Sequence, residues 1–162
     1  MTEDHKRGLL DIIIENSVFL AQDPHGNYVV QHVLRIHNPF VNRRICHKLQ
    51  EFYVRLSMQK SGSHVVETCA KSGGIVYVVN DLVQSDKLVE VAKNQFGNYV
   101  IQTVLKATKS SYPGLNLRLE IALQPHLAEL QYHPNGRNVY NLIKEGIINP
   151  FNGIKQVYWQ YC

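Results

Sequence analysis

Polar and apolar residues repeat along the chain in four segments that align on a glycine. After each of the first three glycines, apolar residues occupy the third, fourth, seventh and eighth positions. This spacing forms one face of an α-helix with 3.6 residues per turn. Strict alternation of apolar and polar residues is absent, so the pattern predicts helices rather than strands. The segments are residues 25–31, 61–67, 96–102 and 135–141.

The four glycines recur with a nearly constant period. Gly26, Gly62, Gly97 and Gly136 are 36, 35 and 39 residues apart in turn. A period in the mid-thirties is typical of a solenoid, in which each unit buries its apolar face against its neighbours. We therefore expect one domain over residues 1–162. Its expected parts are repeats at about 9–44, 45–80 and 81–115 and a C-terminal cap at 116–162.

Further helices are predicted between the glycine segments, which gives an all-α fold. Residues 9–22 predict one helix, and Asn38 followed by Pro39 indicates the start of another. Pro125 predicts a division of the last unit into two short helices. Each glycine is expected to break the chain before its repeat helix. The candidate caps of those helices are Asn27, Ser63 and Asn98.

Composition limits the classes of protein that the chain can belong to. Its 162 residues are one domain's length, and 44% of them are hydrophobic, which excludes a mostly disordered chain. No apolar stretch approaches the length of about 18 residues that crosses a membrane, and no signal-peptide run precedes Asp11. The cysteines Cys46, Cys69 and Cys162 have no paired spacing, which indicates a reduced, intracellular protein.

Polar side chains gather on the helix face opposite the apolar stripe. Positions one and five after each glycine are i and i+4, so they lie side by side, with position two beside them. A cation follows at position nine in the first three units. Positions one, two and five are Asn27, Tyr28 and Gln31, then Ser63, His64 and Glu67, then Asn98, Tyr99 and Gln102. The cations are Arg35, Lys71 and Lys106.

This combination of side chains suits single-stranded RNA. Unstacked bases need rings to stack on and donors or acceptors for their edges. Amides both donate and accept, which matches uracil, whereas the acceptor-only carboxylate of Glu67 matches the two N–H groups of guanine. The cations can contact phosphates, and the net charge of +4 permits a nucleic-acid partner. The alternatives are tyrosines packed between repeats and polar positions that form a solvated helix face.

No arrangement of residues predicts catalysis or metal binding. The histidines lack the paired spacing of a zinc site, and Cys69 lies in the apolar stripe as a core residue. His64 and Glu67 could form an acid–base pair, but Tyr and Gln hold those positions in other units. No Ser/His/Asp set, phosphate-binding loop or dinucleotide motif occurs. We expect no enzyme, metal, cofactor, small-molecule substrate or membrane contact.

At these residues the chain resembles the Pumilio (PUF) family of RNA-binding repeat proteins. The resemblance rests on the segments Gly-Asn-Tyr-Val-Val-Gln and Gly-Asn-Tyr-Val-Ile-Gln and extends from about residue 9 to residue 161. It implies an α-solenoid of Pumilio-type repeats, a curved segment of a right-handed superhelix. The order of the units is similar to the last three of the family's eight repeats followed by the C-terminal cap.

The resemblance also implies which bases are read. In the family, Asn-Tyr-x-x-Gln reads uracil, Ser-x-x-x-Glu reads guanine, and the RNA runs antiparallel to the repeats. The implied target is therefore 5′-UGU, read by the third, second and first units in turn. His64 holds a stacking position where the family often has Asn. The fourth segment, with Arg137, Asn138, Asn141 and Glu145, does not fit a reading set and is assigned to the cap.

The function implied by the resemblance is repression after transcription. An adaptor of this kind binds UGU-containing mRNA in 3′ untranslated regions and recruits a deadenylase complex in the cytoplasm, with nuclear or nucleolar residence as another setting. Because the family binds with about eight repeats, three repeats predict weak binding. Two alternatives are a degenerate scaffold that binds proteins without RNA and a nucleolar relative that binds ribosomal RNA with loose sequence choice.

Overall fold

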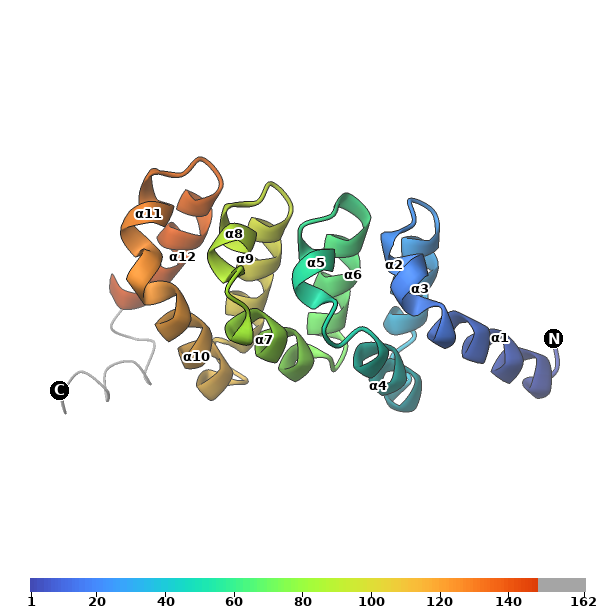
Figure 1. Ribbon diagram of the computed structural model, residues 1–162. Helices are drawn as coiled ribbons and strands as arrows, with labels where there is room; N and C mark the ends of the chain where they lie inside the picture. Colours follow the sequence, from blue (N-terminus) through green and yellow to red (C-terminus); the bar gives the residue numbers. More distant parts are fainter. Residues whose placement is uncertain (149–162) are drawn as a thin grey trace.

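The helices of the protein follow one order that recurs four times. The computed structural model describes residues 1–148, and every regular element in that range is a helix. Each unit contains an outer helix, a short helix and a helix that carries the repeat glycine (Figure 1). The all-α prediction is therefore confirmed.

The bounds of the helices are similar from unit to unit. The outer helices are α1 (Glu3–Glu15), α4 (Pro39–Lys48), α7 (Ile75–Gln84) and α10 (Pro113–Leu123). The short helices are α2 (Ser17–Gln22), α5 (Tyr53–Ser57), α8 (Leu88–Lys93) and α11 (Leu127–Tyr132), with the 3₁₀ turn η1 (Gln124–His126) before the last. The glycine helices are α3 (Gly26–Arg35), α6 (Lys60–Lys71), α9 (Gly97–Thr108) and α12 (Gly136–Ile148).

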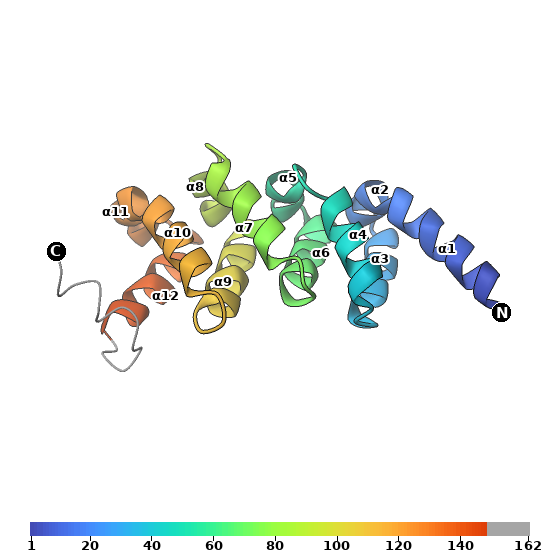
Figure 2. The same cartoon turned by 90° about the horizontal axis from the view of Figure 1, so that it is seen from below.

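Helices of the same kind lie in rows. Figure 2 shows the glycine helices along one side of the molecule and the short helices along the other, and Figure 1 shows the outer helices α4, α7 and α10 along the lower edge of both rows. The chain advances from one end of the stack to the other, so each unit contacts its neighbours in sequence. This is the solenoid that the glycine period predicts.

The core consists of the apolar stripes of the glycine helices packed against the other two rows. Val30, Leu34, Val66 and Ile101 have no exposed surface. Cys69, predicted to fill the core, is also fully buried and is a free thiol, as is Cys46 of α4. Cys162 lies outside the described residues.

The repeat glycines permit a close crossing of two helices within each unit. A Cβ on Gly62 would lie 2.6 Å from the carbonyl oxygen of Leu56, and one on Gly26 would lie 3.0 Å from that of Leu20. Only glycine allows the glycine helix to approach the short helix so closely. Gly62 is the third residue of α6, so the prediction that the glycine breaks the chain before the helix is wrong for that unit.

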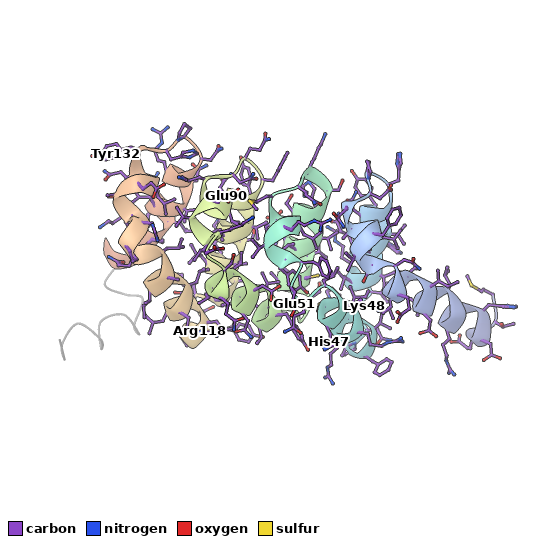
Figure 3. The ribbon with its side chains drawn as sticks, in the orientation of Figure 1. His47, Lys48, Glu51, Glu90, Arg118 and Tyr132 are labelled. Atoms are coloured by element: carbon purple, nitrogen blue, oxygen red, sulfur yellow. The ribbon has the colours of Figure 1, made fainter. Side chains whose placement is uncertain are left out.

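Charged pairs join the outer helices of consecutive units. Arg44 Nη1 lies 2.7 Å from Asp11 Oδ1, and Lys48 Nζ lies 2.7 Å from Glu15 Oε2. Arg118 Nη1 donates to Asn80 Oδ1 at 2.9 Å in the same manner. Lys48 and Arg118 lie along the outer-helix side of the molecule in Figure 3, away from the glycine helices. Such exposed pairs contribute little stability.

Several predicted helix boundaries need correction. The helix expected over residues 9–22 is two helices. The first, α1, begins at Glu3 and ends at Glu15, and the next residue, Asn16, caps it by donating its side-chain amide to the carbonyl of Ile12 at 2.8 Å. The Asn38 cap and the break at Pro125 are confirmed.

The approximate repeat boundaries at 44, 80 and 115 fall inside α4, α7 and α10. This division of the chain stays a prediction, and the end of the expected cap lies beyond the described residues. Over residues 1–148, no helix is both long and apolar enough to cross a membrane. In the same range, no three His, Cys, Asp or Glu side chains are grouped so as to hold a metal ion.

Candidate nucleic-acid interface

The row of glycine helices presents one surface that runs the length of the stack. We call the side chains at positions one, two, five and nine of α3, α6 and α9 the glycine-helix face. The position-two rings all lie open on it: Tyr28 is 67% exposed, Tyr99 is 58% exposed, and the side chain of His64 is 60% exposed. The tyrosines are therefore not packed between repeats, and their ring faces are accessible for stacking.

Position one, expected on the side opposite the apolar stripe, is buried in all three units. Asn27, Ser63 and Asn98 are buried, and so is Gln31 at position five, whereas Glu67 and Gln102 are half-buried. The cause is the stacking of units, since each glycine helix packs beside the next and covers its flank. These polar groups therefore lie at the floor of the glycine-helix face, between the exposed rings.

Backbone carbonyls orient the asparagines of the first and third units. Asn27 Nδ2 donates to the carbonyl oxygens of Asp23 and Pro24, each at 2.9 Å, and its Oδ1 accepts from Gln31 Nε2 at 3.0 Å. Asn98 makes the same set of bonds, with Gln102 Nε2 at 3.1 Å from its Oδ1. Because both N–H groups of each asparagine are occupied, the glutamine supplies the free donor.

The second unit has a carboxylate, that of Glu67, at position five, where the first and third units have an amide. Ser63 Oγ donates to the carbonyl oxygen of Lys60 at 3.2 Å. The carboxylate of Glu67 accepts from Thr103 Oγ1 through Oε1 at 2.6 Å, and its Oε2 lies 3.9 Å from His64 Nδ1. An acceptor-only group therefore lies between two units that carry amides.

The loops before the first, third and fourth glycine helices are capped from three positions before the glycine, whereas Gln59 of the second unit makes no such bond. Asp23 Oδ2 accepts from the backbone N–H groups of His25 and Gly26 at 2.9 and 2.6 Å, and these bonds lower the pKa of Asp23. Asn94 Oδ1 and His133 Nδ1 accept in the same way in the third and fourth units. The predicted caps Asn27, Ser63 and Asn98 are therefore wrong, since these residues lie inside the helices.

The structure brings two of the three predicted phosphate ligands together. Arg35 and Lys71 line a hollow of about 340 Å³ between the first two units, along with Gln31, His64 and Glu67. Lys106 is exposed on α9 but does not line this hollow. The side chains of Arg137, Asn138, Asn141 and Glu145 on α12 are exposed.

The sequence analysis missed several polar contacts between units. Thr68 and Thr103 occupy position six after their glycines and lie 3.3 and 2.6 Å from Gln31 Oε1 and Glu67 Oε1 of the preceding unit. Asn138 Nδ2 donates to Asn98 Oδ1 at 3.3 Å. The repeated threonine at position six is the signal in the sequence that could have identified the first two.

Comparisons with known proteins agree with this repeat pattern. A model of the Pumilio-family RNA binding repeat matches residues 16–37, 52–72 and 87–109, which contain the first three glycine segments. Pumilio homolog 12 of Arabidopsis thaliana is 33% identical over 143 residues, or 86% of this chain and 24% of that protein. Pumilio homolog 11 of the same plant is 40% identical over 66% of this chain and 19% of its own length. The chain thus spans a quarter or less of the length of these relatives.

Solved structures share the fold. PUF-8 in complex with PBE-RNA matches with a TM-score of 0.78 and 21% identity, over 90% of this chain and 44% of that one. The Puf4 RNA binding domain bound to an HO endonuclease RNA 3′ UTR recognition sequence matches with a TM-score of 0.75 and 25% identity, over 87% of this chain and 46% of that one. Because the repeat pattern, the helix order and these relatives agree, the chain belongs to the Pumilio (PUF) family of repeat proteins.

Proposed function

We propose that this chain binds single-stranded RNA along the glycine-helix face, one base per repeat. The observation that carries the proposal is the exposed ring at position two of three successive units. Tyr28, His64 and Tyr99 each lie beside polar side chains. Hydrogen bonds to other protein atoms orient those side chains. Rings supply stacking and the polar groups contact base edges, which is how proteins recognise unpaired bases.

The proposed target is 5′-UGU, read in the order of the third, second and first units. The amide pairs Asn98–Gln102 and Asn27–Gln31 can both donate to and accept from uracil. The carboxylate of Glu67 can accept the two N–H groups of guanine and would repel the carbonyl oxygens of uracil. The direction of the RNA follows from the family resemblance.

Three repeats support only weak binding by this chain alone. Stacking contributes about 1–3 kcal/mol per base, or roughly 3–9 kcal/mol for three bases. A micromolar Kd requires about 8.2 kcal/mol, so we expect affinity on the order of micromolar at best. Arg35, Lys71 and Lys106 would add a term that falls as salt increases.

The proposed cellular role is that of an adaptor that represses UGU-containing mRNAs. The solved Puf4 domain is bound to a 3′ UTR recognition sequence, which supports 3′ untranslated regions as the targets here. The family resemblance supports recruitment of a deadenylase complex in the cytoplasm. In this role the protein binds and recruits but does not catalyse.

Fluorescence anisotropy with a short labelled RNA tests the proposal. The RNAs are one that contains UGU and one in which UGU is changed to UCU, and the proteins are the wild-type chain and Glu67→Ala. We expect the wild type to prefer UGU several-fold and Glu67→Ala to lose that preference. Absent binding would favour the protein-binding scaffold, and binding indifferent to the central base would favour a relative that binds ribosomal RNA loosely.

A further inference from the structure

We propose that Thr103 is a positioning residue that makes Glu67 selective for the central base. This inference rests on the proposed function, because it concerns how the carboxylate in the second unit chooses guanine. Thr103 belongs to the third unit, so the base choice of one repeat would depend on a side chain of the next.

The geometry identifies a strong hydrogen bond between the two helices. Thr103 Oγ1 of α9 lies 2.6 Å from Glu67 Oε1 of α6. A threonine hydroxyl carries a single hydrogen, and an ionised carboxylate only accepts, so the hydroxyl is the donor. Hydrogen bonds to a charged oxygen are shorter and stronger than those between neutral groups, and a distance of 2.6 Å is typical of them. Both side chains are half-buried, which limits competition from water.

This bond restricts the orientation in which the carboxylate can meet RNA. With Oε1 anchored, rotation of the carboxylate is limited, and Oε2 lies 3.9 Å from His64 Nδ1, beside the exposed ring on which a base would stack. Each oxygen retains an unused lone pair for an N–H group of guanine. Without the anchor, the flexible side chain of Glu67 can rotate toward water or toward His64, and fixing it costs entropy when RNA binds.

The choice between guanine and adenine is the property most sensitive to this orientation. Guanine offers two adjacent donors, N1–H and the exocyclic amine, to a fixed pair of acceptors. Adenine has an acceptor at N1, which would face a carboxylate oxygen. Both purines have a ring face that can stack on His64, so we assign the preference to the anchored carboxylate rather than to stacking.

Equivalent positions in the other units do not provide the same anchor. Thr68 Oγ1 lies 3.3 Å from Gln31 Oε1 but 2.8 Å from the carbonyl oxygen of His64 in its own helix, and its single hydrogen goes to the nearer acceptor. The first unit has His32 at this position, exposed on α3. The fourth has Leu142, which cannot donate to Gln102. Within residues 1–148, the anchor is therefore specific to the carboxylate.

The test compares Kd values for RNAs that contain UGU or UAU. Thr103→Val removes the hydroxyl but keeps the shape of the side chain, Thr103→Ser keeps the hydroxyl, and His32→Ala is the control at the same repeat position. We expect Thr103→Val to lower the UGU-to-UAU preference about tenfold, the effect of one hydrogen bond to a charged group. Thr103→Ser should retain the preference, and His32→Ala should leave it unchanged. Thermal unfolding midpoints of the four proteins check that each is folded.

The possible outcomes separate this inference from the proposed function. A wild-type chain that prefers UGU, together with a Thr103→Val variant that keeps the full preference, would overturn only the inference. Equal loss of affinity for both RNAs in Thr103→Val would also overturn it, because that result indicates a purely structural role. A wild-type chain without a preference for UGU would overturn the proposed function and the inference with it.

Discussion

Arg35 Nη2 donates a hydrogen bond to Gln31 Oε1 at 3.1 Å, one turn earlier on α3. The bond joins a side chain predicted to contact phosphate to one predicted to read the third base. Gln31 also donates to Asn27 Oδ1, so the amide is held from both ends. We therefore expect Arg35 to affect base reading through Gln31 and not only through its charge.

We expect Arg35→Ala and Lys106→Ala to weaken RNA binding in different ways. Loss of Arg35 frees the Gln31 amide, so Arg35→Ala should lower the preference for uracil at the third base. Loss of Lys106 removes an exposed charge, so Lys106→Ala should weaken binding to every RNA alike and reduce the salt slope by about 0.7. Anisotropy titrations over a range of KCl concentrations, with UGU and UGC RNAs, measure both effects. Identical behaviour of the two variants would contradict this division of roles.

Tyr99 should contribute to affinity through its ring rather than its hydroxyl. The residue is 58% exposed on the glycine-helix face. Tyr99→Ala should cost about 1–3 kcal/mol of binding free energy, the usual contribution of one stacked base. Tyr99→Phe keeps the ring and should bind within about twofold of the wild type. Isothermal titration calorimetry with UGU RNA measures both, and an equal loss in the two variants would exclude stacking as the main role.

The double variant Ser63→Asn, Glu67→Gln should read uracil at the central position. It gives the second unit the same polar pair as the first and third units, where Gln donates to Asn. Thr103 can still donate to the glutamine oxygen, so the new amide keeps an anchor. We expect a change in preference from UGU to UUU of about tenfold, or roughly 1.4 kcal/mol. Competition binding with the two RNAs measures it, and a retained preference for UGU would contradict the assigned roles.

The period of the glycines and the apolar stripes was sufficient to predict the fold. A helix period repeated every 35 to 39 residues leaves few arrangements other than a stack of helical units, and α3, α6, α9 and α12 follow it closely. The exposed rings at position two were predicted for the same reason. They lie on the side of the helix that no other row of helices covers.

The burial of position one was not predictable from a single helix. Periodicity within α3 separates a core side from an opposite side, but it does not reveal that α6 packs beside α3 or that Asn27 is buried. The links from Thr103 to Glu67 and from Asn138 to Asn98 were missed for the same reason, because they cross between units some 36 to 40 residues apart. Contacts of this kind depend on how the repeats stack.

Gly62→Ala should destabilise the fold, and Gly8→Ala should stabilise it. A methyl group on Gly62 would meet the Leu56 backbone at 2.6 Å, whereas one on Gly8 of α1 meets nothing within 4 Å. We expect Gly62→Ala to lower the free energy of unfolding by about 1–3 kcal/mol through overpacking. Gly8→Ala should raise it by about 0.5–1 kcal/mol, since Gly8 lies in an exposed helix interior. Urea denaturation of the three proteins measures the differences, and equal effects would exclude close packing as the reason for Gly62.

The stability of the first glycine helix should decrease in acid through Asp23. Backbone N–H groups of Gly26 and His25 lower the pKa of this carboxyl below its ordinary value of 3.8. A group whose pKa is lower in the folded state stabilises the fold above its unfolded pKa, and this stabilisation is lost as pH falls through the folded pKa. The loss due to Asp23 should therefore begin below about pH 4.

Asp23→Asn provides the matched control for this pH dependence, because Asn94 caps the third unit with an uncharged oxygen at 2.9 and 3.0 Å. The variant should retain the cap and lose the charge, so its thermal midpoint should fall less steeply than that of the wild type from about pH 6 to about pH 2. Glu15 and Glu129 also have lowered pKa values from Lys48 and Lys93, but they are present in both proteins and cancel in the comparison. Parallel midpoint curves for the two proteins would show that the ionised form of Asp23 has no special role in the cap.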